Sequence, residues 1–223
     1  MAKTLANRFE EFKKRNSLTD KRITDMLTEY SQLVDEHART YFCERYNVTP
    51  YVFYKARDFA IILCLIDSKT IDAVEKKMNN NQASHNEKSN NASSRDHFAK
   101  LRRMRNTYLD SFSKEKVREI AELFLSGERF TDIASKFDIA VYAAKGIIVH
   151  RFCEAFAQND NARILAERFE MNLSSVKKLL AKCVKEHVVS EKVYLQMKHV
   201  SDKISGRNDY HGTTIEDLWL GQK

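Results

Sequence analysis

Three eight-residue stretches of this chain repeat one order of side chains, and that order constrains the fold more than any other feature of the sequence. The stretches are 41–48, 132–139 and 164–171. Each has a small residue at its third position, an aromatic residue at its sixth and an apolar residue at its eighth. A small residue lets two helices approach closely, and the apolar residue fills the turn that joins them. The order therefore predicts, three times, two short helices that meet at a steep angle.

We name these segments the first, second and third corner, in chain order. Their small residues are Cys43, Ala134 and Ala166, their aromatic residues are Tyr46, Phe137 and Phe169, and their apolar residues are Val48, Ile139 and Met171. An apolar-periodic segment follows each corner after a short break, so each corner is expected to introduce a second helix. After the first corner this helix is expected to begin near Pro50, because proline is favoured in a first turn.

Composition favours an all-α fold. Five glycines and one proline among 223 residues leave few helix breakers. Few segments alternate with the period of two that a half-buried strand requires. Hydrophobic residues make up 43% of the chain, which is enough apolar material for real cores. The length suits one large domain or two small ones.

A polar stretch indicates where the chain divides. Residues 79–94 are rich in Asn and Ser and have almost nothing to bury. Residues 79–96 are therefore predicted to be a flexible Asn/Ser-rich linker. The linker would join an N-terminal helical domain, residues 1–78, to a C-terminal helical domain, residues 97–204, that holds the second and third corners in tandem. Residues 205–223 are predicted to be a tail.

Charge and hydropathy limit the partners and the location. A formal net charge of +7 suits a polyanionic partner without identifying one. No apolar run reaches the ~18 residues of a membrane-spanning helix, and the N-terminus lacks the core of a signal peptide. The cysteines Cys43, Cys64, Cys153 and Cys183 are widely spaced without a CxxC pair, and three of them lie on predicted core faces, which is typical of buried, reduced thiols. We expect a cytoplasmic, nucleoid-associated protein without a membrane partner.

The helix after the third corner has the side chains that a DNA-reading helix requires. Such a helix needs an apolar inner face and exposed hydrogen-bond donors near its N-terminus. Val176, Leu179 and Leu180 are expected to face inward. The outward residues that we expect to bind DNA are Asn172, Ser174, Ser175, Lys177, Lys178 and Lys182. Asn and Ser can read bases and the lysines can neutralise phosphates, whereas the alternative is an ordinary solvated, lysine-rich face.

The other two corners offer less to DNA. After the first corner the candidate DNA-binding residues are Thr49, Tyr51, Tyr54 and Lys55. The alternative is that these aromatics only pack against the long apolar helix. After the second corner the candidates are Tyr142 and Lys145, because residues 140–149 are otherwise mostly apolar. That helix is expected to pack against a neighbour: the third corner, another subunit or an RNA polymerase surface.

A dense basic cluster precedes the second corner. Its members are Lys100, Arg102, Arg103 and Arg105. One interpretation is an arm on the DNA backbone, in which Arg102, Arg103 and Arg105 contact phosphates. The other is the charged face of a helix whose opposite face carries apolar residues such as Phe98 and Leu101.

Nothing in the sequence indicates an enzyme. The seven histidines are scattered without metal-ligand spacing to another His, Cys or carboxylate. There is no P-loop, no GxGxxG and no GxSxG. We therefore expect no catalytic residues, no metal and no cofactor.

Residues 113–152 resemble the helix-turn-helix family and, within it, the region of sigma factors that reads promoter DNA. The residues that carry the resemblance are Ile120, Ala121, Leu123, Gly127, Phe130, Ile133, Ala134, Phe137, Ile139, Ala144, Lys145 and Ile147. A weaker match over residues 162–182 rests on Leu165, Ala166, Phe169, Met171, Ser174, Val176 and Leu179. The turn glycine usual in the family is replaced by Asn47, Asp138 and Glu170, of which Asn and Asp tolerate the left-handed conformation better than Glu.

Taken with the resemblance, the sequence predicts a sequence-specific DNA-binding protein, and first of all a transcription regulator with double-stranded DNA as its partner. Helix-turn-helix units in both helical domains would let one chain span two successive major grooves, about 34 Å apart. A homodimer or a contact with RNA polymerase is compatible with this prediction. One alternative is a DNA-binding accessory factor in replication, partition, or phage packaging or recombination. Another is a protein-interaction module that contacts RNA polymerase or a repressor.

Overall fold

The described part of the chain is built from helices joined by short turns. The computed structural model describes residues 4–33, 38–83, 90–158 and 161–205, and these ranges contain no strand. The expected all-α fold is therefore confirmed for them. None of the helices in these ranges has the length and apolar character needed to cross a membrane. Backbone contacts divide the chain into two compact units, Met1–Tyr108 (unit 1) and Leu109–Lys223 (unit 2), and each is described by itself.

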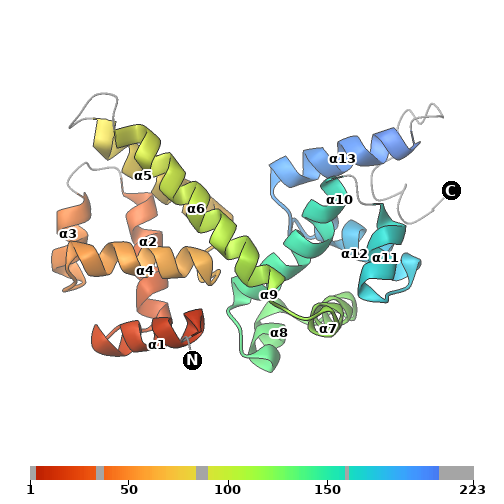
Figure 1. Cartoon of the computed structure of the whole chain (residues 1–223), viewed down its shortest axis with the longest axis horizontal. Helices are drawn as coiled ribbons and strands as arrows, with labels where there is room; N and C mark the ends of the chain where they lie inside the picture. The colour runs from red at the N-terminus through yellow and green to blue at the C-terminus, as the bar shows by residue number, and fades with distance from the viewer. Residues whose placement is uncertain (1–3, 34–37, 84–89, 159–160, 206–223) are drawn as a thin grey trace. The chain divides into compact units, whose positions relative to one another are not determined.

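Unit 1 is centred on its second helix. Its helices are α1 (Leu5–Arg15), α2 (Asp20–Gln32), α3 (Ala38–Arg45), α4 (Pro50–Ile62), α5 (Ser68–Ala83) and α6 (Asn90–Asp110), which ends just inside unit 2 (Figure 1). Helix α2 packs against α3, α4 and α5. Ile23, Met26 and Leu27 of α2 are fully buried together with Phe53 and Ala60 of α4. The long apolar helix after the first corner is thus mostly core, in agreement with its sequence.

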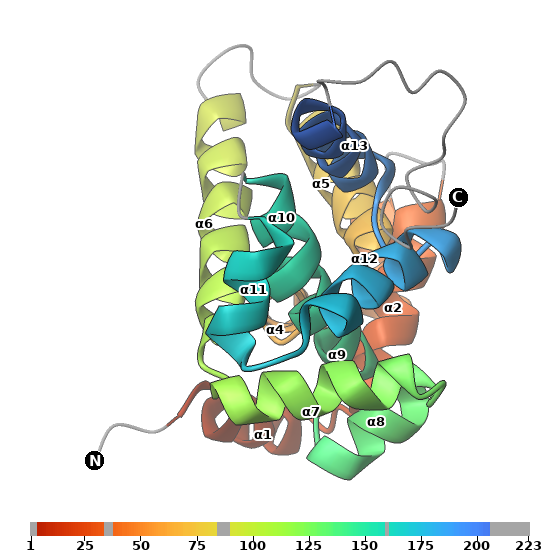
Figure 2. The ribbon, with the colours of Figure 1, turned by 90° about the vertical axis from the view of Figure 1, so that its right-hand side faces the viewer.

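Unit 2 is centred on its first complete helix. Its elements are α7 (Lys114–Leu125), α8 (Phe130–Phe137), α9 (Val141–Ile148), the π-helix η1 (Val149–Glu154), α10 (Ala155–Ala157), α11 (Ala162–Phe169), α12 (Leu173–Lys185) and α13 (Glu191–Ser205) (Figure 2). Helix α7 packs against α8, α9, α11 and α12. Val117, Ile120 and Ala121 of α7 are fully buried as a result. One helix therefore supports both the second and the third corner.

The predicted linker is helical at both ends. Helix α5 continues to Ala83 and α6 begins at Asn90, while residues 84–89 lie outside the described part of the chain. The division between the compact units falls after Tyr108, later than the predicted start of the second domain. The physical reason is that Phe98 and Leu101 of α6 are buried in the core of unit 1. The predicted tail, apart from its first residue, also lies outside the described residues.

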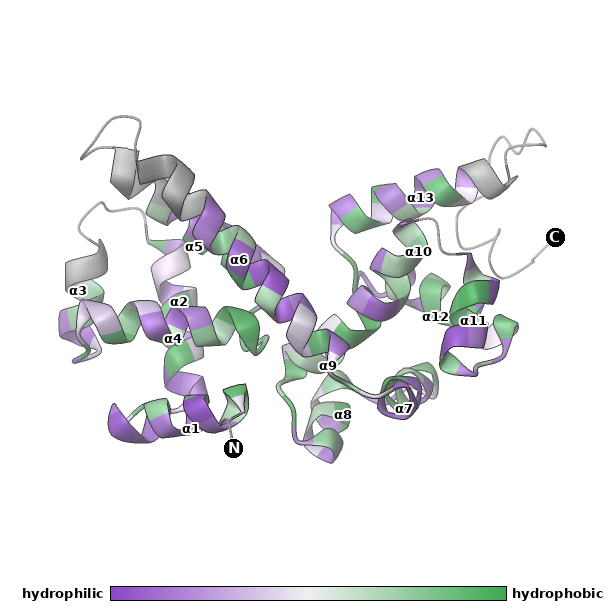
Figure 3. Cartoon of the chain, in the orientation of Figure 1, coloured by the Kyte–Doolittle hydropathy of each residue, from purple (hydrophilic) through white to green (hydrophobic). Residues whose placement is uncertain are grey.

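The distribution of hydropathy follows these two cores. Figure 3 shows hydrophilic and hydrophobic residues alternating around α1 and α6, which is typical of helices with one face in solvent, whereas α9 is mostly hydrophobic. All four cysteines are buried thiols without a disulfide, one more than the three expected on core faces. A hydrogen bond with Cys183, together with burial, raises the pKa of the Cys153 thiol well above its usual value. The Cys153 thiol therefore stays protonated at neutral pH, and the buried cysteines pack as small hydrophobes.

Candidate nucleic-acid interface

The three corners share one backbone geometry. In each, the residue where the family has glycine adopts the left-handed conformation, with φ of 47° at Asn47, 52° at Asp138 and 52° at Glu170. Each first helix contacts its second helix, that is α3 with α4, α8 with α9 and α11 with α12. The sequence pattern therefore located all three turns correctly, including the residue that carries the unusual dihedral angles.

One hydrogen bond closes every corner. The backbone N–H of the apolar eighth residue donates to the carbonyl of the small third residue. The pairs are Val48 to Cys43 at 2.9 Å, Ile139 to Ala134 at 3.0 Å and Met171 to Ala166 at 2.9 Å. The three small residues are buried, as close approach of two helices requires. This is the Schellman arrangement that commonly ends a helix.

The same closure occurs at helix ends that the sequence pattern did not single out. It joins Leu18 to Lys13, Leu65 to Ala60, Glu128 to Leu123 and Val188 to Cys183, with left-handed residues at Ser17, Cys64, Gly127 and His187. The closure alone therefore does not define a DNA-binding unit. What distinguishes the corners is the surface that each second helix presents to solvent.

Helix α12 of the third corner has an apolar inner face and a polar outer face at its N-terminus. Val176, Leu179 and Leu180 are fully buried, as predicted. Asn172, Ser174 and Lys178 are exposed, whereas Ser175 and Lys177 are half-buried at the flanks. Since Ser174 and Lys178 are four residues apart, they share one face of the helix.

Asn172 is the N-cap residue of α12, but its side chain makes no capping hydrogen bond. Its amide therefore keeps both donors and its acceptor for another partner. The first backbone N–H groups of a helix also lack intrahelical partners and carry a partial positive charge, which favours an anion such as phosphate. A free side-chain amide and unpaired backbone N–H groups thus lie together at this helix end.

Lys182 of α12, a predicted DNA-binding residue, contacts the end of α7. Its ammonium group donates a 2.6 Å hydrogen bond to the Phe124 carbonyl of α7 and lies 4.6 Å from the centre of the Phe124 ring. Ala181, one residue earlier, is only 4% exposed. The exposed residues of α12 are consequently Leu173, Ser174 and Lys178 in its first two turns and Lys185 at its C-terminal end.

An acidic residue lies beside this surface. Glu170, the exposed turn residue of the third corner, accepts a 3.2 Å hydrogen bond from the Arg118 guanidinium of α7. The ion pair offsets part of the negative charge next to α12. Lys178 extends the exposed face in the direction away from Glu170 along the helix.

The first corner exposes three of its four candidates, Thr49, Tyr51 and Lys55. Tyr51 is 68% exposed, and the Lys55 ammonium lies 5.8 Å from the centre of its ring. Thr49 caps α4, since its hydroxyl oxygen accepts a 3.3 Å hydrogen bond from the Val52 N–H. Tyr54 is half-buried, with the Arg57 guanidinium 5.0 Å from the centre of its ring. Tyr54 therefore contributes mainly to packing.

The second corner buries most of its second helix inside unit 2. Ala143, Ala144, Ile147 and Ile148 of α9 are fully buried, where α9 packs against α7 and α8. The helical run continues through η1, which packs against α12. Residues 140–149 are thus apolar because of packing within the unit.

At the solvent side of α9, Val141 is 39% and Tyr142 is 37% exposed, while Lys145 is half-buried. The second corner reaches the third through η1 rather than through α9 itself, since the Phe152 ring of η1 lies 4.7 Å from that of Phe169 in α11. Val141 and Tyr142 make this helix end more apolar than the start of α12.

The basic cluster does not form one patch. Arg102 of α6 forms ion pairs with Asp72 and Glu75 of α5. Burial lowers the pKa of the Arg102 guanidinium, but these hydrogen bonds outweigh it and raise that pKa overall. Arg103 is exposed. Arg105 is half-buried, and its buried Nε has no hydrogen-bond partner among the described residues. Lys100 and Arg103, three residues apart, share one face of α6, whereas Arg102 and Arg105 share another, so the charges fall on two faces.

These features define an all-α protein with three tightly closed helix pairs, of which the third presents the most polar and cationic helix end. The described residues contain no group of three or more His, Cys, Asp or Glu side chains placed to hold a metal ion. Comparison of the chain with protein-family models, with curated proteins and with solved structures gave no match.

Proposed function

We propose that this chain binds double-stranded DNA sequence-specifically and regulates transcription, with the N-terminal half of α12 placed in the major groove. The single observation that carries the proposal is the exposed cluster of Asn172, Ser174 and Lys178 above a fully buried inner face. The closed turn at Glu170 supports it, because this turn fixes the angle at which α12 leaves α11.

Each side chain has a definite role in this proposal. Asn172 and Ser174 contact base edges, since an amide can pair with the donor and acceptor of adenine in the major groove. Lys177 and Lys178 contact phosphates on either side and fix the register. Tyr51 at the start of α4 adds a backbone contact from unit 1, and Tyr142 and Lys145 add one from α9.

The test begins with selection of duplexes from a random library by the full-length chain, followed by binding isotherms at about 50 to about 200 mM salt. Replacement of both Lys177 and Lys178 by Ala should weaken binding. It should also make the slope of log affinity against log salt shallower by about 1.8, since each phosphate contact contributes about 0.9.

A matched control replaces Lys192 and Lys198, two exposed lysines of α13, by Ala. This variant loses the same charge and should bind DNA almost as the unaltered chain does. The proposal fails if no duplex is enriched, or if the two double variants weaken binding equally, because the effect would then come from net charge alone.

A second candidate function is a protein contact made by α9. Val141 and Tyr142 are exposed apolar residues at a helix end that has little to offer a base. Such a surface suits a partner such as RNA polymerase. Replacement of Tyr142 by Ser should then abolish co-sedimentation with purified RNA polymerase and leave the affinity for DNA unchanged. If the replacement weakens DNA binding and leaves co-sedimentation with RNA polymerase unchanged, Tyr142 contacts DNA.

A further inference from the structure

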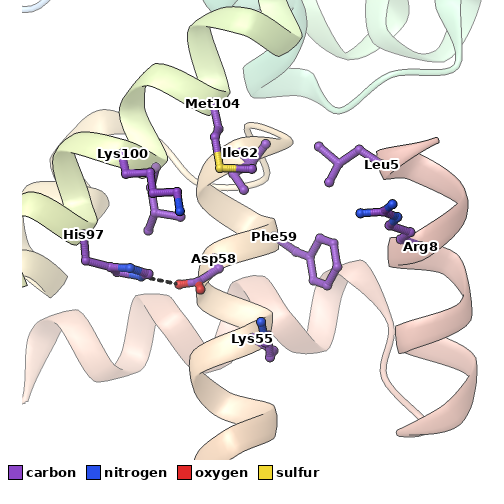
Figure 4. A pocket seen from close by; sticks show the side chains of 10 residues that line it. Leu5, Arg8, Lys55, Asp58, Phe59, Ile62, His97, Lys100 and Met104 are labelled. Carbon is purple, nitrogen blue, oxygen red and sulfur yellow. Dashed lines mark hydrogen bonds and ion pairs between the residues drawn. The ribbon is translucent and has the colours of Figure 1, made fainter. Parts of the chain in front are cut away.

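Unit 1 contains an open pocket between α1, α4 and α6, away from the turns of the three corners. Its volume is about 300 Å³, at the lower end of the range for small-molecule sites. Its apolar walls come from all three helices and include Leu5, Phe59, Ile62, Leu101 and Met104. Figure 4 shows Phe59 and Ile62 of α4 between the side chains of α1 and those of α6.

Three cationic side chains line the pocket, one from each helix. They are Arg8 of α1, Lys55 of α4 and Lys100 of α6, and all three are exposed. Within the described part of the chain, none of the three forms an ion pair. Their charge is thus available to a ligand that enters from solvent.

The one carboxylate in the pocket wall is already engaged. Asp58 Oδ1 accepts a 2.6 Å hydrogen bond from the buried Arg57 guanidinium and lies 3.2 Å from His97 Nε2 (Figure 4). Arg57 therefore offsets the charge of Asp58, so the pocket as a whole is cationic.

We propose that this pocket binds a small organic anion, a compact apolar body carrying one carboxylate or phosphate group. The apolar body would lie against Phe59, Ile62 and Met104, and the anionic group would bind Lys55 and Lys100 at the rim. A bare inorganic anion would leave the apolar walls unfilled. A DNA phosphodiester is flanked by sugars and would not reach them. This inference does not depend on DNA binding by α12.

The assignment changes the interpretation of two basic residues. The sequence makes Lys55 a candidate for DNA contact, and Lys100 belongs to the basic cluster for which an arm on the DNA backbone is one of two interpretations. Their common position at a pocket between three helices gives them a shared ligand instead. The sequence could not show this, because residues 8, 55 and 100 are far apart along the chain.

The experiment uses the full-length chain without DNA and titrates it with 2-naphthoate, 2-naphthyl phosphate, 2-naphthamide and inorganic phosphate. Binding is followed by calorimetry and by the methyl NMR signals of Ile62 and Met104. At least one naphthyl anion should bind at least tenfold more tightly than the uncharged amide and should shift both methyl signals, because a charge-assisted hydrogen bond is worth a factor of ten or more. Inorganic phosphate should bind weakly and leave the methyl signals in place.

Variants identify the site. Lys100→Ala should weaken binding of the preferred naphthyl anion at least tenfold, whereas Lys14→Ala, an exposed lysine of α1 outside the pocket, should not change it. The proposal is overturned if the amide binds as well as both anions, if none of the naphthyl compounds binds at millimolar concentration, or if Lys100→Ala leaves their affinity unchanged. If Lys100→Ala weakens only DNA binding, Lys100 belongs to a nucleic-acid surface and the pocket proposal is wrong.

Discussion

The Lys182 ammonium donates a 2.6 Å hydrogen bond to the backbone carbonyl of Phe124, and this bond ties α12 to the end of α7. Phe124 lies in the last turn of α7, where the helix dipole is negative, and its carbonyl also accepts a 3.1 Å hydrogen bond from the Gly127 N–H. Lys182, which the sequence predicted to bind DNA, is thus a second and charged donor to a carbonyl at the negative end of α7. Its neighbours Lys178 and Lys185 are exposed, so lysines on one helix have separate roles.

Lys182→Ala should lower the free energy of unfolding by about 1–2 kcal/mol, because it removes a charge-assisted hydrogen bond and a cation–π contact. Urea unfolding would measure this loss. The salt dependence of DNA binding should stay unchanged. Lys178→Ala is the matched comparison, and we expect the reverse: little change in stability and a shallower salt slope. If both variants lowered the free energy of unfolding equally, the proposed structural role of Lys182 and DNA-binding role of Lys178 would be contradicted.

Asn172→Ala should weaken binding to the selected duplex about tenfold, because one bidentate base contact is worth about 1–3 kcal/mol. The salt slope should not change, since no phosphate contact is lost. Stability should also stay nearly constant, because the Asn172 side chain makes no capping hydrogen bond. A loss of stability without a change in base preference would show that Asn172 has only a structural role.

Thr49→Ala is the control for that result, because Thr49 is an N-cap residue whose side chain does cap its helix. We expect it to cost about 1 kcal/mol of stability. The contrast between the two caps is measured by thermal or urea unfolding of the two variants in parallel.

Alkaline pH should destabilise unit 1 partly through Tyr46. Burial, and then the 2.7 Å hydrogen bond to Glu29, raises the pKa of the Tyr46 phenol from about 10 to about 12. Because the folded-state pKa is the higher one, this contribution is fully present below pH ~10 and is lost as the pH rises toward ~12. Tyr46→Phe should be less stable than the unaltered chain at pH 8, and the difference should shrink between pH 10 and 12. If the stability difference between the two proteins stays constant over this pH range, ionisation of other groups causes the loss of stability at alkaline pH.

Glu170→Gly should stabilise unit 2 by about 0.5–1 kcal/mol, because a non-glycine residue at φ 52° is strained. The exposed ion pair with Arg118 that it removes is worth less than this. Glu170→Ala keeps the strain and loses the ion pair, so it should not stabilise. Removal of the negative charge in both variants should strengthen DNA binding at low salt, which a binding isotherm would measure.

The corners show what local sequence can predict. The small, aromatic and apolar positions located three turns, and the residues at the glycine position proved to be left-handed. This prediction succeeded because a helix end depends on residues within about one turn of it. The inner face of α12 was predictable for a similar reason, since helical spacing alone puts Val176 and Leu179 on one side.

The sequence by itself determined the helical class, the three turns and the polar start of α12, because these depend on neighbours within a few residues. Tertiary structure decided the rest. Phe98 and Leu101 joined the core of unit 1, Arg102 formed ion pairs with Asp72 and Glu75, and Lys182 turned to Phe124. In each case the partner comes from a different helix, and only folding determines which helices meet.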